Sequence, residues 1–176
     1  MAIDLTDPKY KYNLTIVIFL VALVFLGWNI GDYLLMDLDE PRYPEAAREM
    51  IAAKQYLVPL TNGHFLYEKP ILIYWSQILS FKIFGISEFA ARLPSVIAGA
   101  LTVCLAYIFG RFFNIGLIVS MILMTSMEFF IISRLSIADM LLNLWIISTL
   151  ALYFLISENL IHKNYLYLMA VCISLG

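Results

Sequence analysis

The sequence predicts an all-α, polytopic membrane protein built as a helical bundle. Of the 176 residues, 62% are hydrophobic and only 14% are charged, whereas soluble domains have roughly 45–50% apolar and about 25% charged residues. Four apolar runs approach or exceed the ~20 residues that an α-helix needs to cross a bilayer. The net charge of -2 gives no reason to expect a nucleic acid partner.

The first predicted span covers residues 14–36 and follows a short amino terminus, 1–13, expected in the cytoplasm. No small-residue cleavage site follows this apolar run, so it is interpreted as a retained span and not as a signal peptide.

Residues 37–92 form the first loop, which is expected to hold two surface helices at 44–54 and 71–84. Six charges fall within the eleven positions 39–49, DEPRYPEAARE, and burying each in hydrocarbon would cost about 2.5–3.5 kcal/mol. The helix at 44–54 should therefore lie on the membrane surface, with Glu45 and Arg48 paired at i,i+3.

The segment 71–86 (ILIYWSQILSFKIFGI) follows Pro70 and ends near Gly85. About fifteen helical residues reach roughly 22 Å, less than the ~30 Å of a bilayer core. Its aromatic residues suit a helix lying in the interface. A tilted crossing is the alternative.

The rest of the chain, 93–176, is expected to hold spans two to five. The predicted spans are 93–112, 115–133, 139–157 and a fifth that begins at Tyr165 and reaches Gly176 after twelve residues. A span of that length is too short to cross, so we expect the chain to be the amino-terminal part of a longer protein. Cys104 and Cys172 lie inside apolar runs and are interpreted as buried thiols.

The number of crossings decides which loops share a membrane face. The basic residues Lys9, Lys11, Arg111 and Lys163 in short connections favour a cytoplasmic amino terminus. If 71–84 does not cross, the link 133–139 emerges on the same outer face as 37–92. Charged side chains then gather on that face: Asp39, Glu40, Glu68, Lys69, Arg134 and Asp139. Cations can bind a phosphate there, and carboxylates can accept a proton or orient a hydroxyl.

Each of these motifs also has a simpler interpretation. Asp39 and Glu40 could form a solvated acidic turn, and Lys69 could be an ordinary interfacial lysine. Arg134 and Asp139 could pair with each other, or Asp139 could cap the fourth span.

Four blocks, DLDEPRYPEAAREM, FLYEKPILIYW, GISEFAARLPSVIAGAL and SRLSIADM, resemble the amino-terminal part of the GT-C glycosyltransferases that use polyprenyl-phosphate sugars. The resemblance covers roughly residues 14–157. It is closest to the aminoarabinose transferases of lipid A and the related protein mannosyltransferases.

The resemblance implies an inverting transfer of a hexose or pentose from a polyprenyl-phosphate-linked donor to a lipid or protein acceptor. It implies catalytic roles for Asp39 and Asp139, donor phosphate binding by Lys69, Arg42 and Tyr43, and support from Glu40 and Arg134. Glu68 would contribute to a structural divalent metal site, although the chemistry requires no cofactor. The site would face the exterior or periplasm of the plasma (inner) membrane, and the 176-residue chain alone is expected to be inactive.

Two other functions remain open at this stage. One is a non-catalytic, polyprenyl-phosphate-binding or flippase-like subunit, which would need Lys69 but not Asp39. The other is a structural membrane subunit, in which the charges serve only topology.

Overall fold

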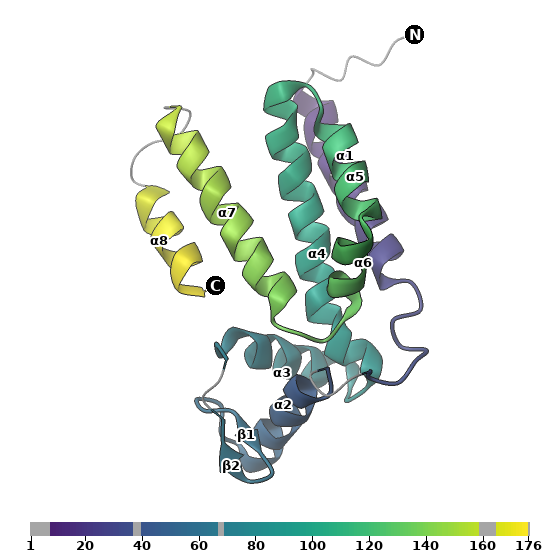
Figure 1. Ribbon diagram of the computed structural model, residues 1–176, viewed down its shortest axis with the longest axis vertical. Helices are drawn as coiled ribbons and strands as arrows, with labels where there is room; N and C mark the ends of the chain where they lie inside the picture. The colour runs from purple at the N-terminus through teal and green to yellow at the C-terminus, as the bar shows by residue number, and fades with distance from the viewer. Residues whose placement is uncertain (1–7, 37–39, 67–68, 159–164, 176) are drawn as a thin grey trace.

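The computed structural model describes residues 8–36, 40–66, 69–158 and 165–175. It consists of a bundle of long helices and, at one end of the bundle, a layer of shorter elements (Figure 1). In chain order the elements are α1 (Pro8–Gly27), α2 (Arg42–Ala53), β1 (Leu60–Thr61), β2 (His64–Phe65), α3 (Leu72–Phe84), α4 (Glu88–Gly110), the 3-10 turn η1 (Arg111–Phe113), α5 (Gly116–Thr125), α6 (Met127–Arg134), α7 (Asp139–Ser157) and α8 (Leu166–Leu175).

Helix α4 is the centre of the bundle and packs against α1, α5, α6 and α7. Small residues on α4 let its neighbours approach closely, as is common between membrane helices. A Cβ added at Gly99 would lie only 2.7 Å from Ser133 Oγ of α6. Around this contact the bundle core contains Leu26, Val103, Phe129 and Met140.

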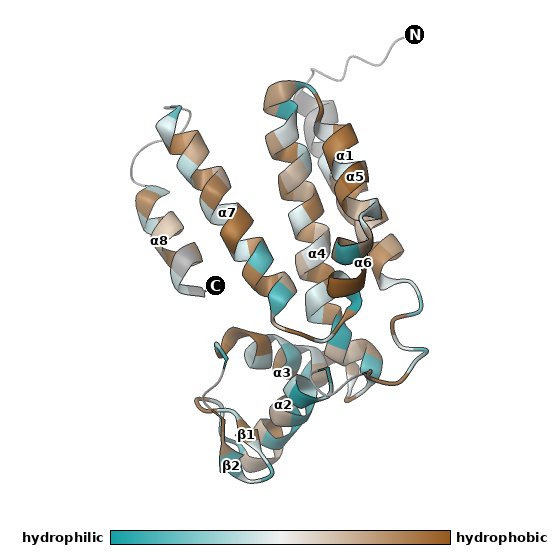
Figure 2. Cartoon of the chain, viewed as in Figure 1, coloured by the Kyte–Doolittle hydropathy of each residue, from teal (hydrophilic) through white to brown (hydrophobic). Residues whose placement is uncertain are grey.

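Two of the helices in the described part of the chain are long and apolar enough to cross a membrane: α4 with its η1 extension, and α7. Both have a mean hydropathy of 1.9, and Figure 2 shows hydrophobic residues along the bundle helices. The apolar part of α1, Asn13–Gly27, is shorter. The predicted fourth span, 139–157, coincides with α7, whereas α4 starts at Glu88, five residues before the predicted second span.

The predicted third span, 115–133, is not a single straight helix. Helices α5 and α6 together have the length of a span but are bent by 67° at their junction. At this junction Ser126 has an extended backbone with ψ 125°, and Ser is a residue that favours helix boundaries over helix interiors.

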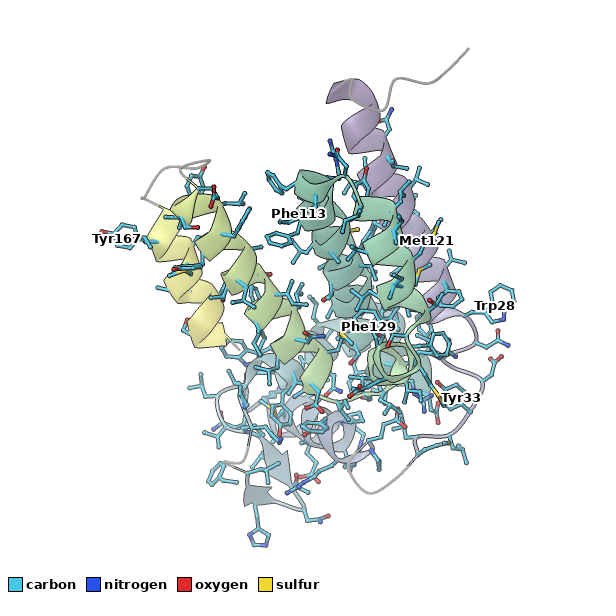
Figure 3. The ribbon with its side chains drawn as sticks, turned by 45° about the horizontal axis from the view of Figure 1, so that its top comes forward. Trp28, Tyr33, Phe113, Met121, Phe129 and Tyr167 are labelled. Atoms are coloured by element: carbon cyan, nitrogen blue, oxygen red, sulfur yellow. The ribbon has the colours of Figure 1, made fainter. Side chains whose placement is uncertain are left out.

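The predicted first span also ends too late, because α1 stops at Gly27 instead of residue 36. Asn29 has a positive φ of 55°, a conformation that commonly terminates helices. Residues 28–36 then run as turns and coil. Trp28 points away from the bundle at this end of α1 (Figure 3), as an interfacial tryptophan does.

The layer at the end of the bundle contains α2, the β1–β2 hairpin and α3. Helices α2 and α3 correspond to the predicted surface helices at 44–54 and 71–84, and α3 has 13 residues. The hairpin was not predicted. Its turn is Asn62-Gly63, both with positive φ, which is a strong sequence signal for a tight hairpin. Both amides donate hydrogen bonds to the carboxylate of Glu49 in α2.

Candidate functional site

A buried ion pair lies where the bundle meets this layer. The side chains of Arg92 and Glu40 are 0% and 2% exposed, and Arg92 Nε donates to Glu40 Oε1 at 2.7 Å. Arg92 Nη2 donates to the other carboxylate oxygen at 3.1 Å, which makes the contact bidentate. Glu40 also accepts a hydrogen bond from the Met36 amide at 2.6 Å. Glu40 is therefore a buried partner of Arg92 and not part of a solvated acidic turn, and its supporting role in the site stays a prediction.

Arg92 also binds the backbone of the segment that follows α1. Its Nη1 donates to the carbonyl oxygens of Ile30 and Tyr33 at 2.6 and 2.8 Å, and its Nη2 donates to that of Leu34 at 3.0 Å. A continuing helix would use these carbonyls for its own amide bonds. The guanidinium also lies 4.0 Å from the ring centroid of Tyr33. Arg92 therefore fixes the backbone of residues 30–34 and the side chain of Glu40 against the start of α4.

Ser136, in the link between α6 and α7, connects this loop to α3 and α4. Its amide donates to Glu40 Oε1 at 3.1 Å, and its hydroxyl donates to the carbonyl of Ala91 at 2.9 Å. The hydroxyl also accepts a hydrogen bond from Gln77 Nε2 of α3 at 2.7 Å. The loop after α1, helix α3 and the α6–α7 link therefore meet at one end of the bundle.

Arg134 and Asp139 flank this link, and in the described residues no ion pair joins them. Arg134 Nη1 donates to the carbonyl of Leu26 at the end of α1, at 3.0 Å, and the guanidinium stacks on Phe130. Asp139 is exposed in the first turn of α7, but the N-cap residue is Ala138. The interpretations of Asp139 as a salt-bridge partner and as a cap are both wrong, and its carboxylate is open to other contacts.

Arg134 also borders a groove of about 710 Å³ between α1 and α6. Its other lining residues are almost all apolar and include Val24, Phe25 and Trp28. A cation at the end of an apolar groove can accommodate an anionic group that carries a hydrocarbon chain.

Of the predicted phosphate ligands, Lys69 is exposed shortly before α3 begins. Tyr43 is 6% exposed, and its ring centroid lies 6.0 Å from that of Tyr74 in α3. Tyr43 therefore packs α2 against α3, and Arg42 is half-buried beside it at the start of α2. Their roles in donor binding stay predictions.

Asp39 and Glu68, the predicted base and metal ligand, lie outside the described residues. Asp39 precedes the clamped Glu40 in sequence, and Glu68 precedes Lys69. Within the described ranges, no three His, Cys, Asp or Glu side chains are close enough together to hold a metal ion. The metal site at Glu68 stays a prediction. Cys104 and Cys172 are buried free thiols, as predicted.

Helix α2 carries the predicted surface pair. Glu45 accepts a hydrogen bond from Arg48 Nε at 2.8 Å, and this contact lowers the pKa of the Glu45 carboxyl. Both side chains are about half exposed, so the pair belongs to a solvated helix face and contributes little to stability.

Sequence reasoning missed the role of Arg92. A signal for it existed, because Arg92 stands at the start of the apolar run LPSVIAGAL, and an ionisable residue beside a span calls for a buried partner. Its partner Glu40 is 52 residues away in sequence, so the chain alone does not identify the pair.

Comparison with known proteins shows one consistent relationship. Residues 68–176 match the family described as dolichyl-phosphate-mannose-protein mannosyltransferase. An undecaprenyl phosphate-alpha-4-amino-4-deoxy-L-arabinose arabinosyl transferase of Shewanella sediminis is 32% identical over 162 residues, which cover 86% of this chain and 28% of that protein. A protein of the same description from Wigglesworthia glossinidia brevipalpis is 28% identical over 176 residues, 96% of this chain and 31% of that protein.

The fold is also that of a solved structure. ArnT from Cupriavidus metallidurans, bound to undecaprenyl phosphate, superposes with a TM-score of 0.69 at 23% sequence identity. The match covers 83% of this chain and 27% of ArnT, and apo ArnT gives a TM-score of 0.72. The predicted all-α, GT-C-type membrane fold is thereby confirmed, and the chain spans less than a third of the length of these relatives.

Proposed function

Because this chain belongs to the dolichyl-phosphate-mannose-protein mannosyltransferase family and resembles its aminoarabinose transferase branch, we propose that it forms the amino-terminal part of a membrane glycosyltransferase. This enzyme moves a sugar from a polyprenyl-phosphate donor to a lipid or protein acceptor. The reaction takes place at the extracytoplasmic face of the plasma (inner) membrane. Lipid A modification and protein mannosylation are the two reactions that the relatives suggest.

The observation that carries the proposal is the buried ion pair between Arg92 and Glu40. It joins the loop after α1 to the α6–α7 link through Ser136, at the end of the bundle where α3 also lies. Asp39 is the residue before Glu40 in sequence, and Asp139 follows the α6–α7 link. This arrangement favours a site made from several separate segments at one membrane interface. The donor's long hydrocarbon chain stays in the bilayer while its headgroup meets the charged loops.

In the proposed reaction an acceptor oxygen attacks the anomeric carbon from the side opposite the phosphate. The bond between the sugar and the phosphate oxygen breaks, and its electron pair stays on the leaving phosphate. Lys69 stabilises this developing charge. Asp39, or alternatively Asp139, takes the proton of an acceptor hydroxyl. For a phosphate acceptor no proton has to be removed, and the carboxylates would orient it instead.

Lys69→Gln in the complete polypeptide, as the cell makes it, tests the proposal. Transfer of a radiolabelled sugar from polyprenyl phosphate should fall roughly 100- to 1,000-fold, as expected when one preorganised charge contact is lost. Lys54→Gln is the matched control, because Lys54 is an exposed lysine of the same loop at the end of α2, and it should leave transfer unchanged.

Two outcomes contradict the proposal. Unaltered transfer by the Lys69 variant removes this lysine from the mechanism. A wild-type protein that binds polyprenyl phosphate but transfers no sugar, and an Asp39→Asn variant that binds equally well, would indicate a non-catalytic lipid-binding subunit.

A further inference from the structure

Gln77 of α3 is a fully buried polar side chain in mainly apolar surroundings, with 0% of its surface exposed. Four neighbouring residues of the same helix belong to the hydrophobic cluster that joins α3 to α2 and α4: Ile73, Tyr74, Ile78 and Phe81. Burial of an amide among apolar groups costs free energy unless its hydrogen bonds are made. Packing alone therefore gives no reason for a glutamine at this position.

The Gln77 amide uses its donor and leaves its acceptor unused. Its Nε2 donates to the hydroxyl of Ser136 at 2.7 Å and, less closely, to the carbonyl of Ala91 at 3.5 Å. The one proton of the Ser136 hydroxyl goes to the Ala91 carbonyl, so this hydroxyl can only accept from Gln77. Within the described residues, the buried Oε1 of Gln77 accepts no hydrogen bond. A buried acceptor without a partner is destabilising, and such exceptions are typical of residues retained for function.

The contact with Ser136 acts on the link that leads to Asp139. Ser136 is 0% exposed, and Asp139 follows it by three residues, at most about 11 Å of chain. The two residues between them, Ile137 and Ala138, pack against the same hydrophobic cluster as α3. The position of the Asp139 backbone is therefore set by contacts that include the one from Gln77.

We propose that Gln77 is a positioning residue for sugar transfer. By donating to Ser136, it holds Asp139 at a fixed distance from Lys69. This role presupposes the proposed function, in which Lys69 stabilises the leaving phosphate and Asp139 orients the acceptor or takes its proton. Lys69 lies three residues before α3 begins at Leu72, and Gln77 lies in the second turn of that helix. One short helix then connects the cation to the carboxylate, and Gln77 itself is too deeply buried to touch a substrate.

Gln77→Met in the complete polypeptide tests the role, because methionine has a similar length and shape but no donor. The kcat for transfer of a radiolabelled sugar from polyprenyl phosphate should fall about 10- to 100-fold, as expected when reacting groups are misplaced by about 1 Å. The KM for the donor should stay within about twofold, since no donor contact is lost. The unfolding midpoint in detergent should not fall, because the unpaired acceptor is removed together with the hydrogen bond.

Ser80→Ala is the matched control. Ser80 is another buried polar residue of α3, but its hydroxyl makes no hydrogen bond in the part of the chain that the structure describes. Its removal should leave both kcat and the unfolding midpoint unchanged. A kcat that falls equally in both variants would overturn the proposal, because any change in the packing of α3 would then have the same effect.

A double-variant cycle determines whether Gln77 acts through Ser136. Added to Ser136→Ala, the Gln77→Met change should lower kcat no further, because the group that it acts on is already gone. Fully multiplicative losses would overturn the proposal, and so would a lowered unfolding midpoint that accounts for the loss of activity. An unaltered kcat in Gln77→Met would reject this role and leave the proposed function intact. A wild-type protein that transfers no sugar would reject both.

Discussion

The contact between Arg92 and Glu40 gives the first residue-scale prediction, because both charges are fully removed from water. Buried ion pairs are tolerated only when their hydrogen-bonding capacity is used. Here the guanidinium has three backbone carbonyls in addition to the carboxylate, and the carboxylate has two backbone amides in addition to the guanidinium. Removal of either partner leaves the other charge buried and unpaired.

Arg92→Met should therefore destabilise the protein by about 3–5 kcal/mol, the usual cost of an orphaned buried charge. The measurement is thermal or denaturant unfolding in detergent, followed by size-exclusion chromatography. Arg92→Lys should also be strongly destabilising. The planar guanidinium of arginine bonds the carboxylate and three carbonyls at once, and the single ammonium group of lysine cannot reach all of them.

The double variant Arg92→Met/Glu40→Leu provides the control. It removes both charges at once, so it should be more stable than Arg92→Met alone. If the single and the double variant lose equal stability, the unpaired charge of Glu40 is not the cause of the destabilisation in Arg92→Met.

The sequence predicted which charged residues are exposed better than it predicted which ones are buried. Asp139 and Lys69 are exposed near helix starts, where the charge pattern placed them. Glu40 looked like a surface acid because its neighbours in sequence are polar, and only the folded chain brings it to Arg92. The burial of a charge depends on contacts between distant segments, and hydropathy along the chain does not report them.

The break between α5 and α6 is the element-scale feature with the clearest consequence. Met127 is the first residue of α6, so its amide has no carbonyl within that helix to bond. Proline is favoured at this position, and the extended conformation of Ser126 is the one that a residue before proline prefers. Met127→Pro should consequently leave stability almost unchanged.

The matched control is Met121→Pro. Met121 is also an exposed methionine, but it lies inside α5. Proline there removes an intrahelical bond and should cost about 3 kcal/mol. Unfolding in detergent would measure both. A straight, unbroken span would instead be damaged by both substitutions.

Element boundaries could be predicted where local chemistry sets them and not where tertiary contacts do. Helix α7 coincides with its predicted limits because apolar sequence begins after Asp139 and polar sequence resumes after Ser157. For α1 the apolar run continues to Met36, yet the helix ends at Gly27. The carbonyls of residues 30, 33 and 34 bond to Arg92 instead, and that competition is invisible in the sequence.

At the scale of the whole molecule, the number of crossings decides whether the proposed site can exist. Helix α3 has 13 residues, roughly 20 Å of helix, and packs against α2 and α4 at the end of the bundle. With α4 leading away from that end and the bent α5–α6 pair returning to it, the hairpin and Asp139 should lie on one membrane face. The other end of α7, at Glu158, should lie on the opposite face.

Single cysteines at His64, Asp139 and Glu158 test this arrangement, since all three residues are exposed and Cys104 and Cys172 are buried. In intact cells, a membrane-impermeant maleimide should label positions 64 and 139, and position 158 only after the membrane is opened. The basic residues of the short connections predict the same orientation. If positions 64 and 139 react from opposite sides, the loop after α1 and the start of α7 do not share a compartment. The proposed active site could not then form, even though the Glu40–Ser136 contact would still require an explanation.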